Sequence, residues 1–190
     1  MAVKTFTAGE TANASDTNLY LTNAGLVYVT SGALSGGTTN FVGCFTSTFT
    51  NYRIVLDNLG GSTAIDFYFR MLQASTPFVT AQYYFAGTGF TTAGANHTTS
   101  GGGQAQMYFG ASSSTAGTST TSASIDLYSP LPAVRTFFTS QGAGISGANY
   151  YIRNVGGAMD NFGVFDGIQF TSLSATTMTG NVTIYGVRKA

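Results

Sequence analysis

From Val27 onward, apolar and polar residues alternate with a period of two, in short runs separated by clusters of glycine, serine, threonine and asparagine. This alternation is typical of half-buried β-strands bounded by turns, and no helical periodicity interrupts it. Because short strands without crossover helices form antiparallel sheets, we expect an all-β fold of about ten strands, an antiparallel β-sandwich that is jelly-roll-like. A barrel is the nearest alternative, and a parallel α/β fold is excluded.

The best-defined strands cover residues 52–57 and 65–70, which are joined through Gly60 and Gly61. A short turn at the two glycines predicts a β-hairpin in which Val55 lies opposite Asp66. The face that this register turns toward the core consists of Ile54, Leu56, Ile65, Phe67 and Phe69. The other face carries Arg53, Asp57, Asp66 and Arg70. We interpret these charges as a structural ion-pair patch on the surface, with Arg53 diagonal to Asp66.

The remaining strands follow the same alternation. They are expected at Phe41 to Phe45, Ala81 to Ala86, Gln104 to Phe109, Ala123 to Tyr128, Ala133 to Thr139, Asn149 to Arg153, Phe165 to Thr171 and Asn181 to Val187. Between them lie glycine-rich segments that we expect to be loops, at Gly87 to Gly103, Gly110 to Thr121, Gln141 to Ala148 and Gly156 to Gly163. Loops of this length in a compact domain usually bind something, move, or are held by a neighbouring subunit.

Residues 1–25 differ from the sandwich domain that we place at residues 26–190. Asn13 is followed three residues later by Asp16, a variant of the capping box, which predicts a short helix over residues 14–23 that ends at Gly25. The apolar residues of that helix are Leu19, Tyr20 and Leu21. A helix of about ten residues is marginal alone, so we expect this segment to be an anchor that docks on the domain or on a partner.

The charge composition excludes several classes of partner. The chain has seven basic and seven acidic residues among 190, and no cluster of lysine or arginine. Nucleic acid is therefore not an expected partner, because phosphate neutralisation supplies most non-specific affinity for it. No stretch is long and apolar enough for membrane insertion as a helix, and the first residues lack the apolar core of a signal peptide. We expect a chain that is made in a cytoplasm and stays soluble.

No constellation of reactive residues predicts an enzyme. His97 is the only histidine, which excludes mechanisms that need two imidazoles, and we interpret it as a solvated loop residue. Asp160 and Asp166 flank Asn161 to Gly163, where a turn explains Asp160 and the start of a strand explains Asp166 better than a pair of catalytic carboxylates does. Cys44 is the only cysteine, and we expect a buried thiol. The glycines match no phosphate-binding motif, so no cofactor and no metal is expected.

Two tyrosine pairs are the best candidates for binding. Tyr83 and Tyr84 are adjacent in one expected strand, and Tyr150 and Tyr151 are adjacent in another. Neighbouring side chains of a strand point to opposite faces, so one ring of each pair is expected in the core and the other at the surface. The exposed rings suit a glycan or a protein partner, and an interface between subunits is the simpler interpretation.

Two parts of the chain resemble virion proteins of tailed bacteriophages. The opening Phe6 to Glu10, followed by a capped helix with Asp16 and Asn18, is similar to the N-termini of many short phage proteins with a β-rich fibre or head-associated domain. The segments from Asn51 to Leu59, Ala123 to Tyr128 and Gly180 to Lys189 resemble single sandwich domains of tail fibres and related appendages. The resemblance implies a virion location and a homotrimer.

We therefore expect a structural virion component, a tail fibre or receptor-binding appendage that is anchored by residues 1–25. A capsid decoration protein, either a head knob or a head fibre, is the alternative within the same class. A carbohydrate-binding module and a depolymerase are the alternatives from other classes. The expected partners are other virion proteins, further copies of this chain and, for a receptor-binding protein, a host-surface glycan.

Overall fold

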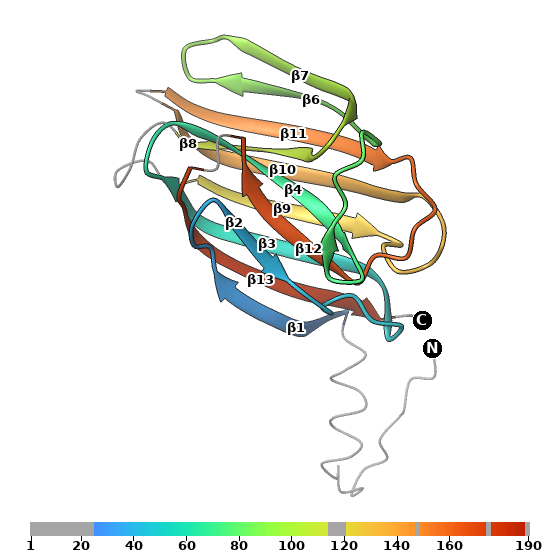
Figure 1. Ribbon diagram of the computed structural model, residues 1–190. Helices are drawn as coiled ribbons and strands as arrows, with labels where there is room; N and C mark the ends of the chain where they lie inside the picture. The colour runs from blue at the N-terminus through green and yellow to red at the C-terminus, as the bar shows by residue number, and fades with distance from the viewer. Residues whose placement is uncertain (1–24, 114–120, 147–148, 174–175, 189–190) are drawn as a thin grey trace, which may run out of the picture.

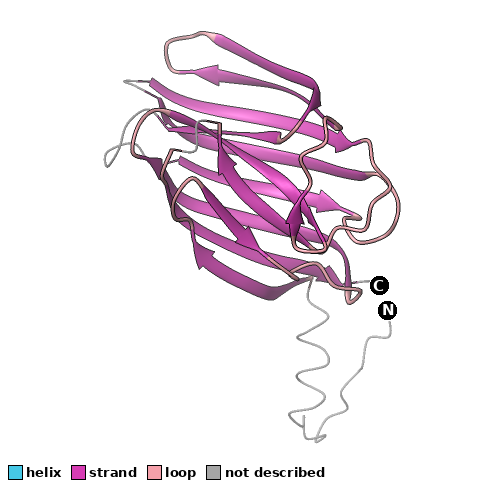
Figure 2. Ribbon diagram, viewed as in Figure 1, coloured by secondary structure: helices cyan, strands magenta, loops and turns pink. Residues whose placement is uncertain are grey.

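The computed structural model describes residues 25–113, 121–146, 149–173 and 176–188. These residues form thirteen β-strands and no helix, as the magenta ribbon of Figure 2 shows. The strands are β1 (Leu26–Ala33), β2 (Thr38–Phe41), β3 (Phe49–Gly61), β4 (Ile65–Gln73), β5 (Thr76–Pro77), β6 (Tyr83–Thr91), β7 (Asn96–Gln104), β8 (Met107–Ser113), β9 (Thr121–Tyr128), β10 (Thr136–Ser146), β11 (Asn149–Met159), β12 (Gly167–Ser172) and β13 (Met178–Arg188). The all-β prediction is confirmed for the described residues.

The strands belong to two sheets, in which every pairing is antiparallel. The larger sheet has eight strands in the order β1-β13-β3-β9-β10-β11-β6-β7. The smaller sheet has the order β2-β12-β4-β5, and β8 also pairs with β4. In Figure 1 the smaller sheet lies across the middle of the larger one, and the β6–β7 hairpin lies at the top of the view.

One hydrophobic core lies between the two sheets. Alternate residues of β3 and β9 supply it from the larger sheet, and alternate residues of β4 and β12 supply it from the smaller sheet. Phe69 of β4 and Phe138 of β10 meet across the layers, with ring centroids 5.3 Å apart in a T-shaped arrangement. The inward direction predicted for Ile54, Leu56 and Phe67 is confirmed, since each is at most 1% exposed.

The predicted hairpin between residues 52–57 and 65–70 is wrong. β3 belongs to the larger sheet and β4 to the smaller, so Val55 does not lie opposite Asp66. Gly60 and Gly61 do not form the turn but continue β3, where they pair with β13. The error has a physical reason: two strands that face one core from opposite layers show the same alternation as two strands that pair side by side.

The surface charge patch predicted on that hairpin is also wrong. Arg53 pairs with Asp126 of β9, and Asp57 accepts a hydrogen bond from Asn181. Asp66 and Arg70 are on β4, in the other layer, where Asp66 accepts a hydrogen bond from the Ser112 hydroxyl and Arg70 donates to the side chains of Gln106 and Gln169. Because β3 and β4 lie in separate sheets, the four charges do not form one grid.

Three of the four predicted loops contain long stretches of strand. Most of Gly87 to Gly103 belongs to a hairpin of β6 and β7, and most of Gln141 to Ala148 belongs to β10. Gly156 to Met159 completes β11, which pairs with β10 over its whole length. β8 likewise extends to Ser113, although residues 114–120 lie outside the described residues. Runs of glycine, threonine and serine show little alternation of apolar and polar residues, so the sequence pattern misses strands that backbone pairing holds together.

The remaining differences are smaller. Of the strand predicted at Phe41 to Phe45, only Phe41 is in a strand, at the end of β2, while Cys44 and Phe45 are buried outside any strand. The strands predicted at 133–139 and 165–171 begin a few residues later, at Thr136 and Gly167. The predicted helix over residues 14–23 and the anchor residues Asn13, Asp16, Leu19, Tyr20 and Leu21 lie outside the described residues.

Candidate functional site

A row of large and small side chains crosses the outer face of the eight-stranded sheet. Tyr128 pairs with Phe137, Phe137 with Ala158, and Ala158 with Tyr84, so the four residues are successive cross-strand partners on β9, β10, β11 and β6. Directly paired residues of an antiparallel sheet share a face, so these side chains lie side by side. The rings of Tyr84, Tyr128 and Phe137 are 45%, 39% and 51% exposed.

A shallow groove of about 660 Å³ lies between these rings. Its floor consists of small residues, among them Ala86, Gly156 and Ala158, while Tyr84 lies on one side and Phe137 with Tyr128 on the other. We call this surface the aromatic groove. Flat rings beside a floor without bulky side chains can stack on a sugar ring or on an aromatic side chain.

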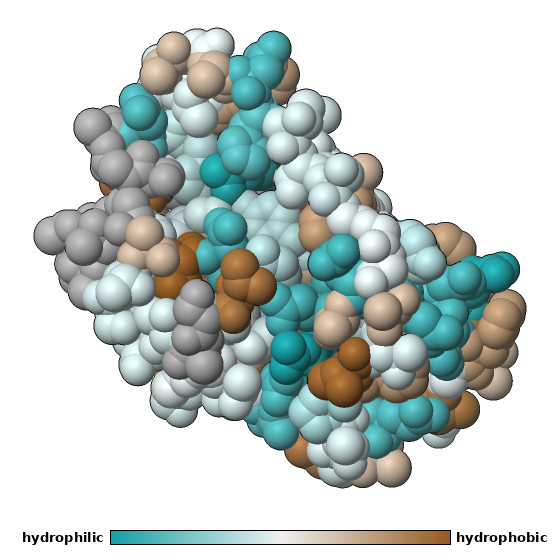
Figure 3. Space-filling view, turned by 45° about the horizontal axis from the view of Figure 1, so that its top comes forward, coloured by the Kyte–Doolittle hydropathy of each residue, from teal (hydrophilic) through white to brown (hydrophobic). Residues whose placement is uncertain are grey.

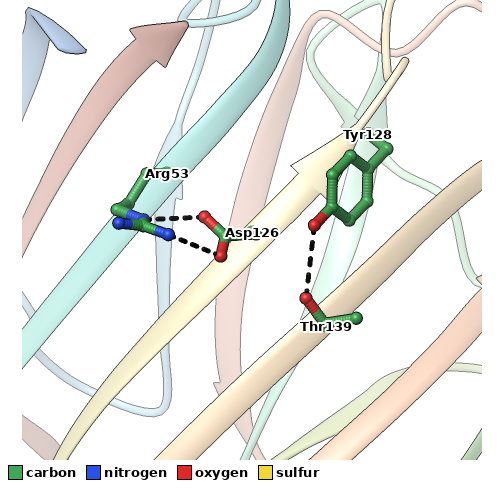
Figure 4. Close-up of polar contacts among 4 residues, drawn as sticks. All are labelled: Arg53, Asp126, Tyr128 and Thr139. Carbon is green, nitrogen blue, oxygen red and sulfur yellow. Dashed lines mark hydrogen bonds and ion pairs between the residues drawn. The ribbon is translucent and has the colours of Figure 1, made fainter. Parts of the chain in front are cut away.

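An ion pair borders the aromatic groove (Figure 4). Arg53 donates from Nε and Nη2 to the two carboxylate oxygens of Asp126, at 2.7 and 2.8 Å. This hydrogen-bonded carboxylate raises the pKa of the Arg53 guanidinium above its ordinary value. The two side chains are 45% and 31% exposed, so the pair contributes about 1 kcal/mol or less. Tyr128 and Thr139 lie alongside, with their hydroxyl oxygens 3.5 Å apart.

A row of amides and hydroxyls lies two rows further along the same face, beyond the row of Asp126, Thr139, Gly156 and Ala86. Ser124, Gln141, Asn154 and Thr88 are successive partners on β9, β10, β11 and β6. The Gln141 amide donates to Oδ1 of Asn154 at 3.1 Å, and both side chains are exposed. Together with the Arg53–Asp126 pair they line a second hollow of about 750 Å³. The face therefore offers stacking surface and hydrogen-bonding groups next to each other.

The alternation predicted for the two tyrosine pairs is confirmed. Tyr83 and Tyr151 are buried, whereas Tyr84 and Tyr150 are 45% and 62% exposed. The Tyr83 hydroxyl donates to the carbonyl of Phe78 at 2.8 Å, and burial raises the pKa of this hydroxyl. Tyr83 and Tyr151 therefore support the fold, and only Tyr84 and Tyr150 present surface to a partner.

Tyr150 lies apart from the aromatic groove, near two other exposed apolar residues. Ile152 and Phe90 are cross-strand partners on β11 and β6, and they are 54% and 65% exposed. On the face that Figure 3 shows, separate brown patches of hydrophobic residues lie among pale and teal ones.

The other residues considered for chemistry do not come together. His97 is exposed on β7, opposite Gly89, and not in a loop. Asp160 pairs with Arg135 at 2.7 Å, while Asp166 accepts a hydrogen bond from the backbone N–H of Ser75 at 3.1 Å. Each carboxylate thus has a separate structural partner. No group of three or more metal-ligating side chains is found within the described ranges.

Cys44 is buried and free, as expected. Its thiol donates a hydrogen bond to the carbonyl of Phe41 at 3.3 Å. Burial raises the pKa of this thiol to about 12, so the nucleophilic thiolate is scarce at neutral pH. The side chain packs as a small apolar group.

Phe137 and Tyr128 are surface residues that the sequence interpretation missed. The adjacent Phe137 and Phe138 carry the same signal as the tyrosine pairs, because one ring of a neighbouring pair in a strand must face outward. The row that joins Phe137 to Tyr84 could not be found in this way, since it depends on which strands pair.

Comparisons with known proteins identify no relative. No protein-family model, no curated protein and no solved structure matches the chain. Among the described residues, no helix is long and apolar enough to cross a membrane.

Proposed function

We propose that this chain is a non-enzymatic structural component of a tailed-bacteriophage virion, a tail fibre or receptor-binding appendage whose aromatic groove contacts a saccharide of the host surface. The resemblance of residues 6–21 and of the segments at 51–59, 123–128 and 180–189 to such proteins supports the virion assignment. Residues 1–25 are the proposed anchor to the particle. A saccharide of the host surface is the proposed partner of the aromatic groove.

The strand order supports a sandwich of the jelly-roll type. Eight of the strands, β1, β2, β3, β4, β8, β9, β12 and β13, occur as β1-β13-β3-β9 in one layer and β2-β12-β4 with β8 in the other. Counted along the chain, these orders are 1-8-3-6 and 2-7-4-5, which is the jelly-roll connectivity. Jelly rolls occur in viral capsid and lectin domains, although a fold does not by itself fix a function.

The observation that carries the binding half of the proposal is the aromatic groove. Tyr84 and Phe137 flank a floor of glycine and alanine, and the exposed amides of Gln141 and Asn154 lie in the adjoining hollow. The C–H face of a sugar ring packs against such rings, while its hydroxyl groups need donors and acceptors of this kind. With Arg53 and Asp126 already paired, binding should depend little on ionic strength.

The location of the protein on the particle tests the proposal that it is a virion component. Antibodies against the sandwich should label the tail of purified particles. Labelling of the capsid alone would replace the appendage with the head decoration protein, and the absence of any label would refute a virion component.

A glycan array tests the binding half. The full chain should bind a restricted set of host-surface glycans, and Tyr84→Ala should weaken that binding about 5- to 150-fold, because stacking on an aromatic ring contributes about 1 to 3 kcal/mol in comparable ring contacts. Tyr28→Ala is the matched control, since Tyr28 is 60% exposed on β1, at the opposite edge of the same sheet. An equal loss in both variants would contradict the assignment of the groove. Release of reducing ends from host polysaccharide would point to a depolymerase instead.

The homotrimer rests on the resemblance, and the exposed cluster of Phe90, Tyr150 and Ile152 is the surface that we assign to contact between subunits. Aromatic and aliphatic side chains are enriched at such contacts. Light scattering during size-exclusion chromatography should give three times the 19.7 kDa of one chain. A monomer at micromolar concentration would refute this assignment without affecting the aromatic groove.

A further inference from the structure

Another hollow lies on the inner face of the larger sheet, where that sheet extends past the edge of the smaller sheet. Its volume is about 300 Å³, and a hollow of about 270 Å³ adjoins it through shared lining residues. Three side chains, Asp66 of β4, Arg153 of β11 and Leu173, line both. We call this surface the edge pocket. It is separate from the aromatic groove, because Arg153 lies on the inner face of β11 and Ala158 on the outer face.

Arg153 is the unusual residue of the edge pocket. It is 8% exposed, between the buried Tyr151 and Val155 on the inward face of β11. Its guanidinium carbon lies 4.4 Å from the centre of the Tyr151 ring, and Nη1 donates to the hydroxyls of Tyr108 and Ser112. Nε is fully buried and has no acceptor among the described residues.

Among the residues that the structure describes, no carboxylate forms an ion pair with Arg153. Within the described residues, the arginines that form ion pairs are Arg53 and Arg135, whose side chains are about half exposed. Arg153 is bridged to a carboxylate only through Ser112, whose hydroxyl donates to Asp66. Pairing matters most for a buried charge, because an uncompensated one is costly to bury. Within the described residues, the exposed Arg53 and Arg135 are ion-paired, whereas the buried Arg153, like the half-buried Arg70, is not.

The rest of the lining is suited to a polar ring. Tyr68 and Phe85 present aromatic surface, and Gln104 and Gln106 present amides. The Tyr68 and Tyr108 rings lie 5.5 Å apart, so that side of the pocket is aromatic. Asp66 is exposed and can accept hydrogen bonds from ligand hydroxyls. A volume of about 300 Å³ is at the lower end of the range for small-molecule sites.

We propose that the edge pocket binds a carboxylate-bearing saccharide, such as a uronic acid residue, whose carboxylate lies against the Arg153 guanidinium. The ring packs on Tyr68 and Phe85, and the hydroxyl groups bond to Asp66 and the two glutamines. A small carboxylate alone satisfies only the guanidinium, whereas a neutral sugar leaves the buried charge uncompensated. An acidic sugar supplies both the negative charge and the hydroxyl groups that this lining can bond. This inference does not depend on the saccharide proposed for the aromatic groove.

Three small probes separate these cases. Glucuronate carries the charge and the hydroxyls, glucuronamide keeps the ring without the charge, and acetate keeps the charge without the ring. Titration of the full ¹⁵N-labelled chain, followed by amide chemical shifts, should show glucuronate binding roughly tenfold more tightly than either other probe, as charge-assisted bonds are about twice as strong as neutral ones. The shifts should centre on residues 66–68, 97–108 and 153.

Equal affinity for glucuronate and glucuronamide would overturn the role of Arg153, and equal affinity for acetate would overturn the saccharide. No shift at any concentration, or shifts centred on Tyr84 and Phe137, would overturn the edge pocket. The second of these results would leave the proposed receptor function intact.

Two variants complete the test. Arg153→Met keeps the length of the side chain without its charge and should abolish the preference for glucuronate over glucuronamide, whereas Arg135→Met, which removes an exposed arginine, should leave it unchanged. If Arg153→Met fails to fold, Gln104→Ala decides, since Gln104 is exposed on β7 and its amide donates to the carbonyl of Gly102, its one side-chain hydrogen bond within the described ranges. This variant should weaken both sugars several-fold and leave acetate unchanged. Unaltered sugar affinity would refute the proposal.

Discussion

Two neighbouring phenylalanines of β10 give a sharp test of both the core and the aromatic groove. Phe138 is 2% exposed and Phe137 is 51% exposed, so adjacent positions differ almost entirely in burial. Phe138 meets Phe69 across the layers at 5.3 Å, and its ring packs over Gly157, where a Cβ atom would be only 2.4 Å from Phe138 Cε1. Replacement of either residue by alanine removes the same atoms from the chain.

The expected costs follow from burial. An aromatic side chain buries about 150 to 250 Å², or about 4 to 6 kcal/mol at 25 cal/mol per Å², and measured core replacements of phenylalanine by alanine cost about 3 to 5 kcal/mol. We expect Phe138→Ala near the upper end of the measured range, because the contact with Phe69 is lost as well. Phe137→Ala should cost about 0.5 kcal/mol, as exposed positions usually do.

The assay is urea unfolding followed by far-ultraviolet circular dichroism at one fixed protein concentration. Phe137→Ala should lose glycan binding while it keeps its stability, and Phe138→Ala should lose stability. A large loss of stability in Phe137→Ala would mean that another surface covers the outer face, which would refute an open aromatic groove.

Three further outcomes are expected. Asp66→Asn keeps an acceptor for Ser112 but removes the carboxylate that Ser112 bridges to Arg153, so it should lower the free energy of unfolding in urea by about 1 to 2 kcal/mol. The control Asp57→Asn should lower it by less than about 0.5 kcal/mol. Equal losses would contradict the electrostatic link between Asp66 and Arg153. Burial raises the pKa of Cys44 to about 12, so the unfolded thiol loses its proton first and stability should fall as pH rises above about 8.5. Cys44→Ala should flatten this fall between about pH 8.5 and 10, below the titration of unfolded tyrosines, and an unchanged slope would show that another group is responsible. Gly157→Ala should destabilise by about 1 to 3 kcal/mol, because its Cβ would lie 2.3 Å from the Tyr84 carbonyl oxygen, whereas a Cβ at Gly102 meets only the Tyr84 ring at 3.5 Å and should be tolerated in the same assay.

The direction in which side chains point was predictable from the sequence, while the assignment of strands to layers was not. Alternation places Ile54 and Phe67 inward correctly, because burial has a period of two in any strand. It cannot separate a hairpin from a chain that crosses between layers, so the connection after Gly61 was misinterpreted. Only the pairing of β3 with β13 and β9 resolves this ambiguity.

The sequence pattern also fails to predict the glycine-rich strands. Gly87 and Gly89 lie in β6, where a Cβ atom would be 2.4 Å from the Asn154 carbonyl oxygen and 2.6 Å from the Ile152 carbonyl oxygen, respectively. Glycine occupies these positions because β11 lies too close for a side chain, and not because the segment is a loop. The edge pocket did leave a signal, since alternation puts Arg153 on the same face as the buried Tyr151. A charged residue in an inward position of a strand is the feature to search for in similar sequences.

The position of β13 bears on how the chain folds. β13 lies between β1 and β3 and pairs with both, from Leu26 opposite Val187 on one side to Gly61 opposite Met178 on the other. Before residues 178–188 are synthesised, β1 and β3 lack the strand that joins them. Such long-range pairing slows folding and leaves β edges exposed in the meantime. Production of this protein should therefore benefit from chaperones that protect unpaired strands.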